Sequence, residues 1–202
     1  NGAPSESGGF GALSKFEWSE ERQAKWAVRR LLGDLGRDIP SSYFSICDML
    51  YPGPRINHKG LLAIKPDRSI DHVKPSYYAV QRVAAIFDNR LQRIRDFEWQ
   101  SPAETATKTL SVFAYADAQG RQVVTVWRRD APPQDGTPFT PVALKLPKAS
   151  FKEPVFVDML SGGVYTIPAS RIQREGASLT IKGLPVSDSV VLIAERALIP
   201  LK

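Results

Sequence analysis

The chain has 202 residues, a formal net charge of +6 and a hydrophobic content of 43%. These values are close to the average for folded soluble domains, so they exclude a disordered tail, a collagen-like repeat and a coiled coil. No apolar run approaches the roughly 18 residues that a membrane-spanning helix needs, so no membrane partner is expected. The length allows one large domain or two small ones, each able to bury a core.

The positive charge is spread evenly along the chain. Residues 1–100 hold 15 basic and 12 acidic side chains, and residues 101–202 hold 12 and 9, so each half carries +3. A surface that binds nucleic acid gathers its bases on one helix or loop, because phosphate neutralisation sets its affinity. We therefore interpret the charge as solvated surface and expect no nucleic-acid partner. The densest basic clusters are Arg29-Arg30, Arg93 with Arg95, and Arg128-Arg129.

The single cysteine, Cys47, excludes an internal disulfide and a cysteine-based zinc site. Its apolar surroundings, residues 43–50, predict a buried and unreactive thiol. The only histidines are His58 and His72. Because His58 has no second histidine or acid clustered with it in the sequence, we expect no metal and no cofactor. The sequence shows no secretion signal, which by itself leaves the cellular compartment open.

Two helices are predicted in the first hundred residues. Ser19 is an N-cap candidate followed by two acidic residues, and Gly36 is a helix-stop signal, so the first helix is expected between them. The second is expected to open at Lys74-Pro75-Ser76, because proline suits the first helical position. The predicted buried face of the first helix comprises Ala24, Ala27, Val28, Leu31 and Leu35, and that of the second comprises Val80, Val83, Ala84, Phe87, Leu91 and Ile94.

Short apolar runs lie between the two predicted helices. Residues 42–47 predict a buried strand, residues 51–59 a turn-rich loop, and residues 60–64 a second apolar run. These elements amount to fewer than two βα units, whereas a parallel sheet needs both of its faces and both of its edges covered. Either further strands come from elsewhere, or the first half packs directly on the second.

Beyond residue 100 the hydrophobic period changes from helical to two. Residues 110–116 and 122–128 predict strands joined by a hairpin connection at 117–120. Seven short strands separated by Gly, Pro and Asp favour an antiparallel sandwich of about 100 residues. The other five predicted strands are 142–146, 155–159, 163–167, 178–181 and 190–194.

A series of motifs follows in a fixed order: a Gly/Pro/Ser-rich loop at 1–11, Gln23-Ala24-Lys25-Trp26 with Arg29-Arg30, Cys47-Asp48-Met49, Gly60-Leu61-Leu62, and Lys74-Pro75-Ser76-Tyr77-Tyr78-Ala79. In this order they resemble the last quarter of a (β/α)8-barrel glycoside hydrolase of the large retaining clan. Residues 156–165 and 184–192 are similar to the turn and final strand of the β-sandwich often appended to such barrels. The resemblance covers nearly the whole chain.

The resemblance implies a fold in two parts. Residues 1–96 would form an α/β remnant, the last two βα units of a TIM-type barrel, and residues 97–202 an all-β antiparallel accessory sandwich. In that family the nucleophilic glutamate would stand just before Asn1 and the acid/base residue further upstream. No catalytic residue is therefore expected in the chain, which alone is predicted to be inactive. Glu6 and Glu17 are interpreted as exposed loop carboxylates.

Sugar contacts are expected on the two βα loops, residues 1–18 and 48–59, since barrel active sites lie at the C-terminal face. Asp48 and Tyr51 each have a second interpretation, as a cap for local backbone and as loop packing respectively. Hydroxyl acceptors, donors and a stacking surface suit a carbohydrate partner. The candidate substrate-binding residues are Asn1, Asp48, Tyr51, Asn57 and His58.

Three functions are therefore considered. The first is the C-terminal segment of a retaining glycoside hydrolase of oligo- or polysaccharides, whose partner is the N-terminal part of the barrel in the same or another chain. The second is a non-catalytic carbohydrate-binding module, and the third is a structural domain whose open sheet edges pair with another chain. The first explains both halves, and by its resemblance it favours a periplasmic or secreted location.

Overall fold

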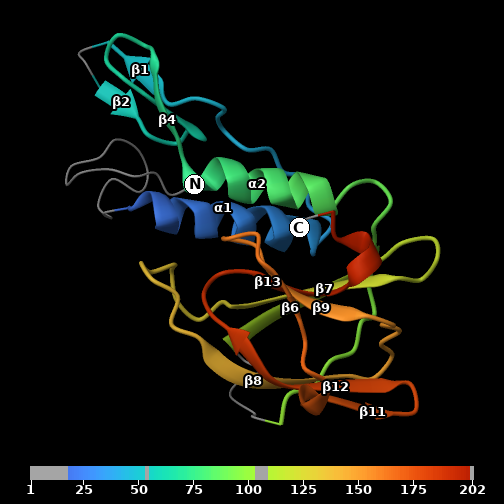
Figure 1. Ribbon diagram of the computed structural model, residues 1–202. Coiled ribbons are helices and arrows are strands. Elements are labelled where there is room, and N and C mark those ends of the chain that lie inside the picture. The colour runs from blue at the N-terminus through green and yellow to red at the C-terminus, as the bar shows by residue number, and fades with distance from the viewer. Residues whose placement is uncertain (1–17, 53–54, 103–108, 201–202) are drawn as a thin grey trace.

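The computed structural model describes residues 18–52, 55–102 and 109–200 (Figure 1). It consists mostly of antiparallel strands with two α-helices, α1 (Glu20–Leu35) and α2 (Pro75–Ile86). The helices lie side by side across one face of a six-stranded sheet, and a three-stranded sheet covers its other face. The result is three layers, with two small hairpins extending beyond the helices.

The strands form two larger sheets and two hairpins. The six-stranded sheet has the order β10 (Val164–Thr166), β9 (Pro154–Asp158), β13 (Val191–Glu195), β7 (Gln122–Arg128), β6 (Leu110–Ala116) and β5 (Gln92–Ile94). The three-stranded sheet has the order β11 (Ile172–Glu175), β12 (Ser178–Val186) and β8 (Thr140–Leu146). The hairpins are β1 (Met49–Tyr51) with β2 (Arg55–Asn57), and β3 (Leu62–Ile64) with β4 (Ile70–Val73). Short 3-10 turns occupy η1 (Ala169–Arg171) and η2 (Arg196–Leu198).

All seven strands predicted in the second half form, and β6 and β7 have the predicted bounds. Gly120 supplies the left-handed residue of their connecting turn, at φ 74°. The two sheets enclose one apolar core because each strand turns alternate side chains inward. Its fully buried members include Val124, Val126, Leu144, Leu146, Leu179, Val191 and Ile193.

A second core fills the space between the helices and the six-stranded sheet. Of the two arrangements that the sequence left open, the described residues show the direct one, in which the first half packs on the second. The sheet thus has both faces covered, so β13 is buried along its whole length. The members of this core include Ala24, Val28, Leu32, Ala79, Val83, Ile86, Val157, Met159 and Leu192.

The helix boundaries agree with the sequence signals, but the buried faces differ in part. Ser19 accepts a hydrogen bond from the Arg22 amide at 3.1 Å, Gly36 ends α1, and Pro75 opens α2. Leu35 is 40% exposed and Ala84 is exposed, contrary to prediction. Leu35 is the last residue of α1, and Ala84 lies outside the stripe that α2 buries against α1 and the sheet. The side chains that it buries are Ser76, Ala79, Val83 and Ile86.

The predicted buried strand at 42–47 is wrong. Phe44 and Ile46 are 50% and 65% exposed, and of this segment only Cys47 forms a bridge, parallel to Leu62. Strand propensity reflects packing between neighbouring strands, and among the described residues no strand flanks the outer side of this segment. Cys47, predicted to be buried, is a partly exposed free thiol. Residues 51–59, predicted as a loop, contribute to the β1–β2 hairpin.

Candidate functional site

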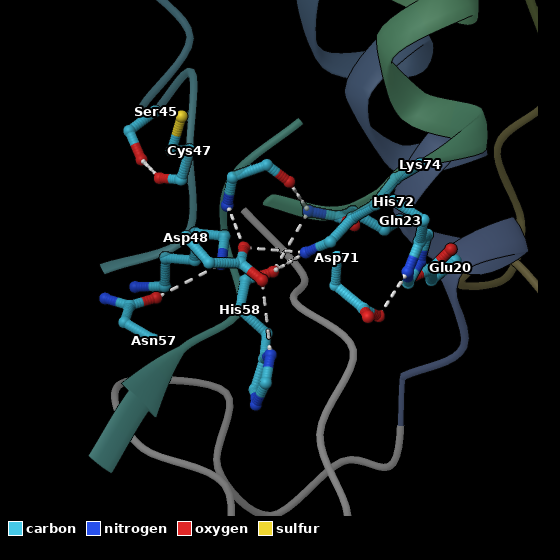
Figure 2. A network of polar contacts seen from close by, with 12 residues as sticks. Glu20, Gln23, Ser45, Cys47, Asp48, Asn57, His58, Asp71, His72 and Lys74 are labelled. Atoms are coloured by element: carbon cyan, nitrogen blue, oxygen red, sulfur yellow. Dashed lines mark hydrogen bonds and ion pairs between the residues drawn. The ribbon is translucent and has the colours of Figure 1, made fainter. Parts of the chain in front are cut away.

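Three of the five candidate sugar-contact residues lie together at the base of the β1–β2 hairpin. Asp48 stands immediately before β1, and Asn57 ends β2 directly opposite Met49, so that His58 follows beside Asp48. Figure 2 shows the three side chains around one network of polar contacts. Asn1 lies outside the described residues.

The carboxylate of Asp48 is completely buried and is bound by its own chain. Its Oδ1 accepts hydrogen bonds from Lys74 Nζ at 2.7 Å and from the Gly60 amide at 2.8 Å, and its Oδ2 lies 3.4 Å from His58 Nδ1. Burial alone would raise the pKa of Asp48, but the hydrogen bonds from His58 and Lys74 and the charge of Lys74 outweigh it and lower the pKa. Asp48 is therefore held as a carboxylate and caps local backbone.

Lys74 is the cation that makes this burial possible, with 1% of its side chain exposed. Its Nζ also donates to the carbonyl of His58 at 3.0 Å, and its backbone amide donates to Leu61 O at 3.0 Å. The residue occupies the N-cap position of α2. The ion pair thus ties the segment before β1, the loop after β2 and the start of α2 to one point.

α1 closes the network from the other side through Gln23, which is 1% exposed. Its Nε2 lies 3.1 Å from Gly60 O, 3.2 Å from His58 O and 3.3 Å from Tyr43 Oη. Burial raises the pKa of Tyr43 to about 12, so its phenol stays protonated at neutral pH. In the sequence, the sign of this contact is a polar residue, Gln23, next to the apolar stripe of the first helix.

Lys25 binds a different part of the chain from the same turn of α1. Its buried Nζ donates to Gln134 O at 2.7 Å and to Gly136 O, and it forms an ion pair with Asp188 at 3.1 Å. The Gln23-Ala24-Lys25 motif therefore holds the hairpin region with one side chain and the Pro-rich loop of the sandwich with another. No local sequence pattern indicates this second contact, because its partners lie more than 100 residues away.

The exposed part of the site consists of His58 and Tyr51. The His58 side chain is 41% exposed, and its ring projects from the network in Figure 2. Tyr51, at the far end of β1, is 38% exposed. Asn57 is buried, and its Oδ1 accepts a hydrogen bond from the Lys59 amide at 3.2 Å, which shapes the loop that carries His58. The arrangement presents an imidazole and a phenol on a rigid base.

The other histidine links the β3–β4 hairpin to α1. His72 Nε2 lies 2.7 Å from Glu20, and its Nδ1 lies 2.8 Å from Asp71. The hydrogen bond to Asp71, followed by that to Glu20, raises the pKa of His72. The imidazolium form therefore bridges the helix and the hairpin.

We expect this bridge to be lost as the pH rises. A histidine with a raised pKa in the folded state adds stability that is complete below the unfolded value of about 6.5 and disappears as the pH passes the folded value. An NMR titration of His72 should give a pKa above 6.5, and Glu20→Gln should lower it. A His72 pKa at or below 6.5 in the intact chain would contradict this geometry.

Within the described ranges, no group of three or more His, Cys, Asp and Glu side chains is placed to hold a metal ion. In the same part of the chain, neither helix has the length and apolar character that crossing a membrane requires.

Among known proteins, similarity to this chain is found in solved structures. No family model matches the chain, and no curated protein matches it. Among solved structures, the chain is similar to the catalytic domain of GH30 xylanase C from Talaromyces cellulolyticus, with a TM-score of 0.39 and 16% sequence identity. The match covers 68% of this chain and 27% of that chain, so the chain spans about a quarter of the length of that structure.

Proposed function

We propose that the chain is the C-terminal segment of a retaining glycoside hydrolase that acts on oligo- or polysaccharides. One observation carries the proposal. Gln23, Asp48, Gly60 and Lys74 come from four different motifs of the resemblance, and all four meet in the buried network under the β1–β2 hairpin. Motifs that match a family in order and also contact one another act as one structural unit, here the end of a (β/α)8 barrel within residues 1–96, with residues 97–202 as the accessory sandwich.

In this proposal the network positions the sugar-contact residues. Active sites of such barrels are built from loops at the carboxyl ends of the strands, and the proposal assigns the β1–β2 hairpin to these loops, with the bridge between Cys47 and Leu62 in the place of the preceding strand. Tyr51 supplies a stacking surface and His58 a hydrogen-bonding group. Asp48 and Lys74 act through Tyr51 and His58 as positioning residues, because each neutralises the charge of the other. Asn1 and Asn57 remain candidate contacts.

The remaining barrel units are the proposed partner of the first half. Exposed large apolar side chains mark interaction surfaces when they gather in one region. Here they belong to the segment before β1, to β4 and to the start of α2. The side chains are Phe44, Ile46, Ile70, Val73 and Tyr78, between 40% and 65% exposed. We assign this surface to the other βα units of the barrel, in the same or another chain.

The reacting carboxylates would come from those units. Retaining hydrolysis needs an acid/base and a nucleophile about 5 Å apart, and in the proposed barrel both stand on strands that precede this chain. Residues of this chain would bind and orient the sugar. The chain alone is expected to release no product.

The test is hydrolysis by the protein that contains this chain together with its other barrel units. Gluco-, xylo- and galacto-oligosaccharides are incubated with that protein and with residues 1–202 alone, and the anomeric configuration of the first product is followed by NMR. We expect hydrolysis with retention in the first case and none in the second. Failure of the larger protein on all three series would refute the proposal.

A second candidate, a carbohydrate-binding module, is favoured by a groove in the sandwich. The groove has a volume of about 490 Å³ and lies between β9–β10 and β12. Phe139 and Tyr165 stand on it, 51% and 55% exposed, and the Tyr165 ring lies 6.0 Å from that of Phe156. For a binding module of this kind, Tyr165→Ala is expected to weaken oligosaccharide binding by residues 1–202, whereas Tyr51→Ala is not.

A further inference from the structure

Two basic clusters that are about 100 residues apart in the sequence meet at one pocket. The pocket has a volume of about 210 Å³ and lies where α1 packs on β6 and β7. Its walls include Trp26, Arg29, Arg30, Arg37, Trp127 and Arg129. No acidic side chain is among its described lining residues. The even distribution of charge along the sequence therefore conceals a local concentration of arginines.

Carboxylates among the described residues neutralise only part of this charge. Arg30 forms an ion pair with Asp34 at 2.6 Å. Arg29 and Arg37 instead donate to carbonyl oxygens, of Ala131 at 3.0 Å and of Gly33 at 2.6 Å. Burial lowers the pKa of Arg29, and the charges of Asp188 and Asp130 only oppose that effect. Neither guanidinium has a carboxylate within 4.0 Å among the described residues, so both keep charge to offer a ligand.

The position of Arg37 is fixed by the small residue beneath it. A side-chain carbon on Gly33 would lie 3.1 Å from Arg37 Nη1, so the guanidinium occupies the space that the missing side chain leaves. The Arg37 guanidinium also lies over the Phe113 ring, 5.2 Å from its centroid. A guanidinium held in this way loses little freedom when it binds an anion.

Trp26, one of the lining residues, carries a donor that the described residues do not use. The indole Nε1 of Trp26 is buried and has no hydrogen-bond partner among the described residues. Buried donors are normally paired, so an unpaired one beside four arginines is a second sign that an acceptor belongs here. A hydrogen bond from a guanidinium group to an anion is charge-assisted and therefore stronger than one between neutral groups.

From this combination of arginines, a free indole donor and small volume we propose that the pocket binds a single oxyanion group. The shared chemistry is that of a carboxylate, sulfate or phosphate, whose oxygens match the N–H pairs of guanidinium groups. The volume is below that of ordinary ligand pockets, about 300–1,000 Å³, and suits one such group rather than a whole oligosaccharide. The source is either a free inorganic anion or an acidic substituent of a glycan. The inference does not depend on the proposed hydrolase function.

The experiment is an NMR titration of the full chain with sodium sulfate, sodium phosphate and sodium glucuronate, at constant ionic strength maintained with NaCl. The indole N–H resonances of Trp26 and Trp127 report on the pocket, and that of Trp99, which packs against the other core, is the internal reference. We expect saturable shifts of the first two. Arg29→Gln and Arg37→Gln should each weaken binding about tenfold, since each removes a charge-assisted contact.

Arg68→Gln is the matched control, because it removes the same charge from the turn between β3 and β4. Its affinity should equal that of the unchanged chain. Arg37→Lys keeps the charge but lacks the planar fork, so its affinity should lie between those of Arg37→Gln and the unchanged chain. An intermediate affinity would show that the loss in Arg37→Gln is not a folding defect. Shifts with glucuronate alone identify an acidic glycan, and shifts with sulfate or phosphate identify an inorganic anion. The proposal is overturned if no anion moves the two resonances, or if Arg29→Gln and Arg37→Gln bind like Arg68→Gln.

Discussion

Asp48→Asn is expected to lower the free energy of unfolding by about 3–5 kcal/mol, because it leaves the ammonium of Lys74 buried without a partner charge. Both members of this pair are at most 1% exposed, and they lie 2.7 Å apart. Urea denaturation measures the loss. The lowered pKa of Asp48 adds a pH dependence with a definite sign. Its stabilisation is present above the unfolded value of about 3.9 and is lost as the pH falls through the folded value.

A matched control is Glu98→Gln, which breaks an exposed ion pair. Glu98 and Lys148 lie 3.5 Å apart with 62% and 74% of their side chains exposed. Such pairs contribute at most about 1 kcal/mol. Because Lys74→Met removes the stranded charge, the Asp48→Asn/Lys74→Met double variant should recover part of the stability lost by the first change. The network does not hold the hairpin as described if the double variant loses the sum of the stabilities lost by Asp48→Asn and Lys74→Met alone. The same follows if Asp48→Asn lowers the free energy of unfolding no more than Glu98→Gln does.

Gly60→Ala is the second change expected to have a large effect. A side-chain carbon at this position would lie 2.1 Å from the Asp48 amide nitrogen and 2.2 Å from the Cys47 carbonyl carbon. Both are backbone atoms, so the two segments must separate. Overpacking of this kind costs about 1–3 kcal/mol and occasionally more, and here it also breaks the Gly60–Asp48 hydrogen bond. We therefore expect a loss of about 3 kcal/mol or more in urea denaturation.

Gly120→Ala separates this steric effect from the ordinary cost of replacing a glycine. Gly120 has a left-handed backbone, φ 74°, but nothing lies within 4 Å of an added carbon. It should lose only about 1–2 kcal/mol, from the left-handed conformation. In amide NMR spectra the Gly60 variant should shift the signals around His58 and the start of α2, whereas Gly120→Ala should not. Equal losses for the two variants would show that residues 60 and 48 are not in contact.

The parts of the fold that depend on local chemistry follow from the sequence. Ser19 and Pro75 mark where the two helices begin, because each serves the first helical turn itself. Alternation of apolar residues predicts β6 and β7 with their bounds, since one face of each strand meets the core between the sheets. These signals need no knowledge of distant residues.

The parts that depend on distant partners do not follow from it. The segment 42–47 has the composition of a buried strand, yet Phe44 and Ile46 are exposed because strands on both sides would be needed to bury them. From the sequence, Lys74 can be recognised only as the residue before Pro75. Its burial depends on Asp48, which lies 26 residues earlier in the chain. Arg29 and Arg129 look like separate solvated charges until the packing of α1 on the sheet brings them to one pocket.

Under the proposed function, the Asp48 network presents Tyr51 and His58 to a sugar in the assembled enzyme. The direct measurement is kcat/KM for oligosaccharide hydrolysis by the protein that contains this chain and its other barrel units, with and without the Tyr51→Ala/His58→Ala double change. We expect a loss of about tenfold or more, since a stacking surface and a hydrogen-bonding group are removed together. The Phe139→Ala/Tyr165→Ala protein, altered only in the sandwich groove, should keep the original value. A Tyr51/His58 double variant as active as the unchanged enzyme would show that neither side chain contacts the sugar.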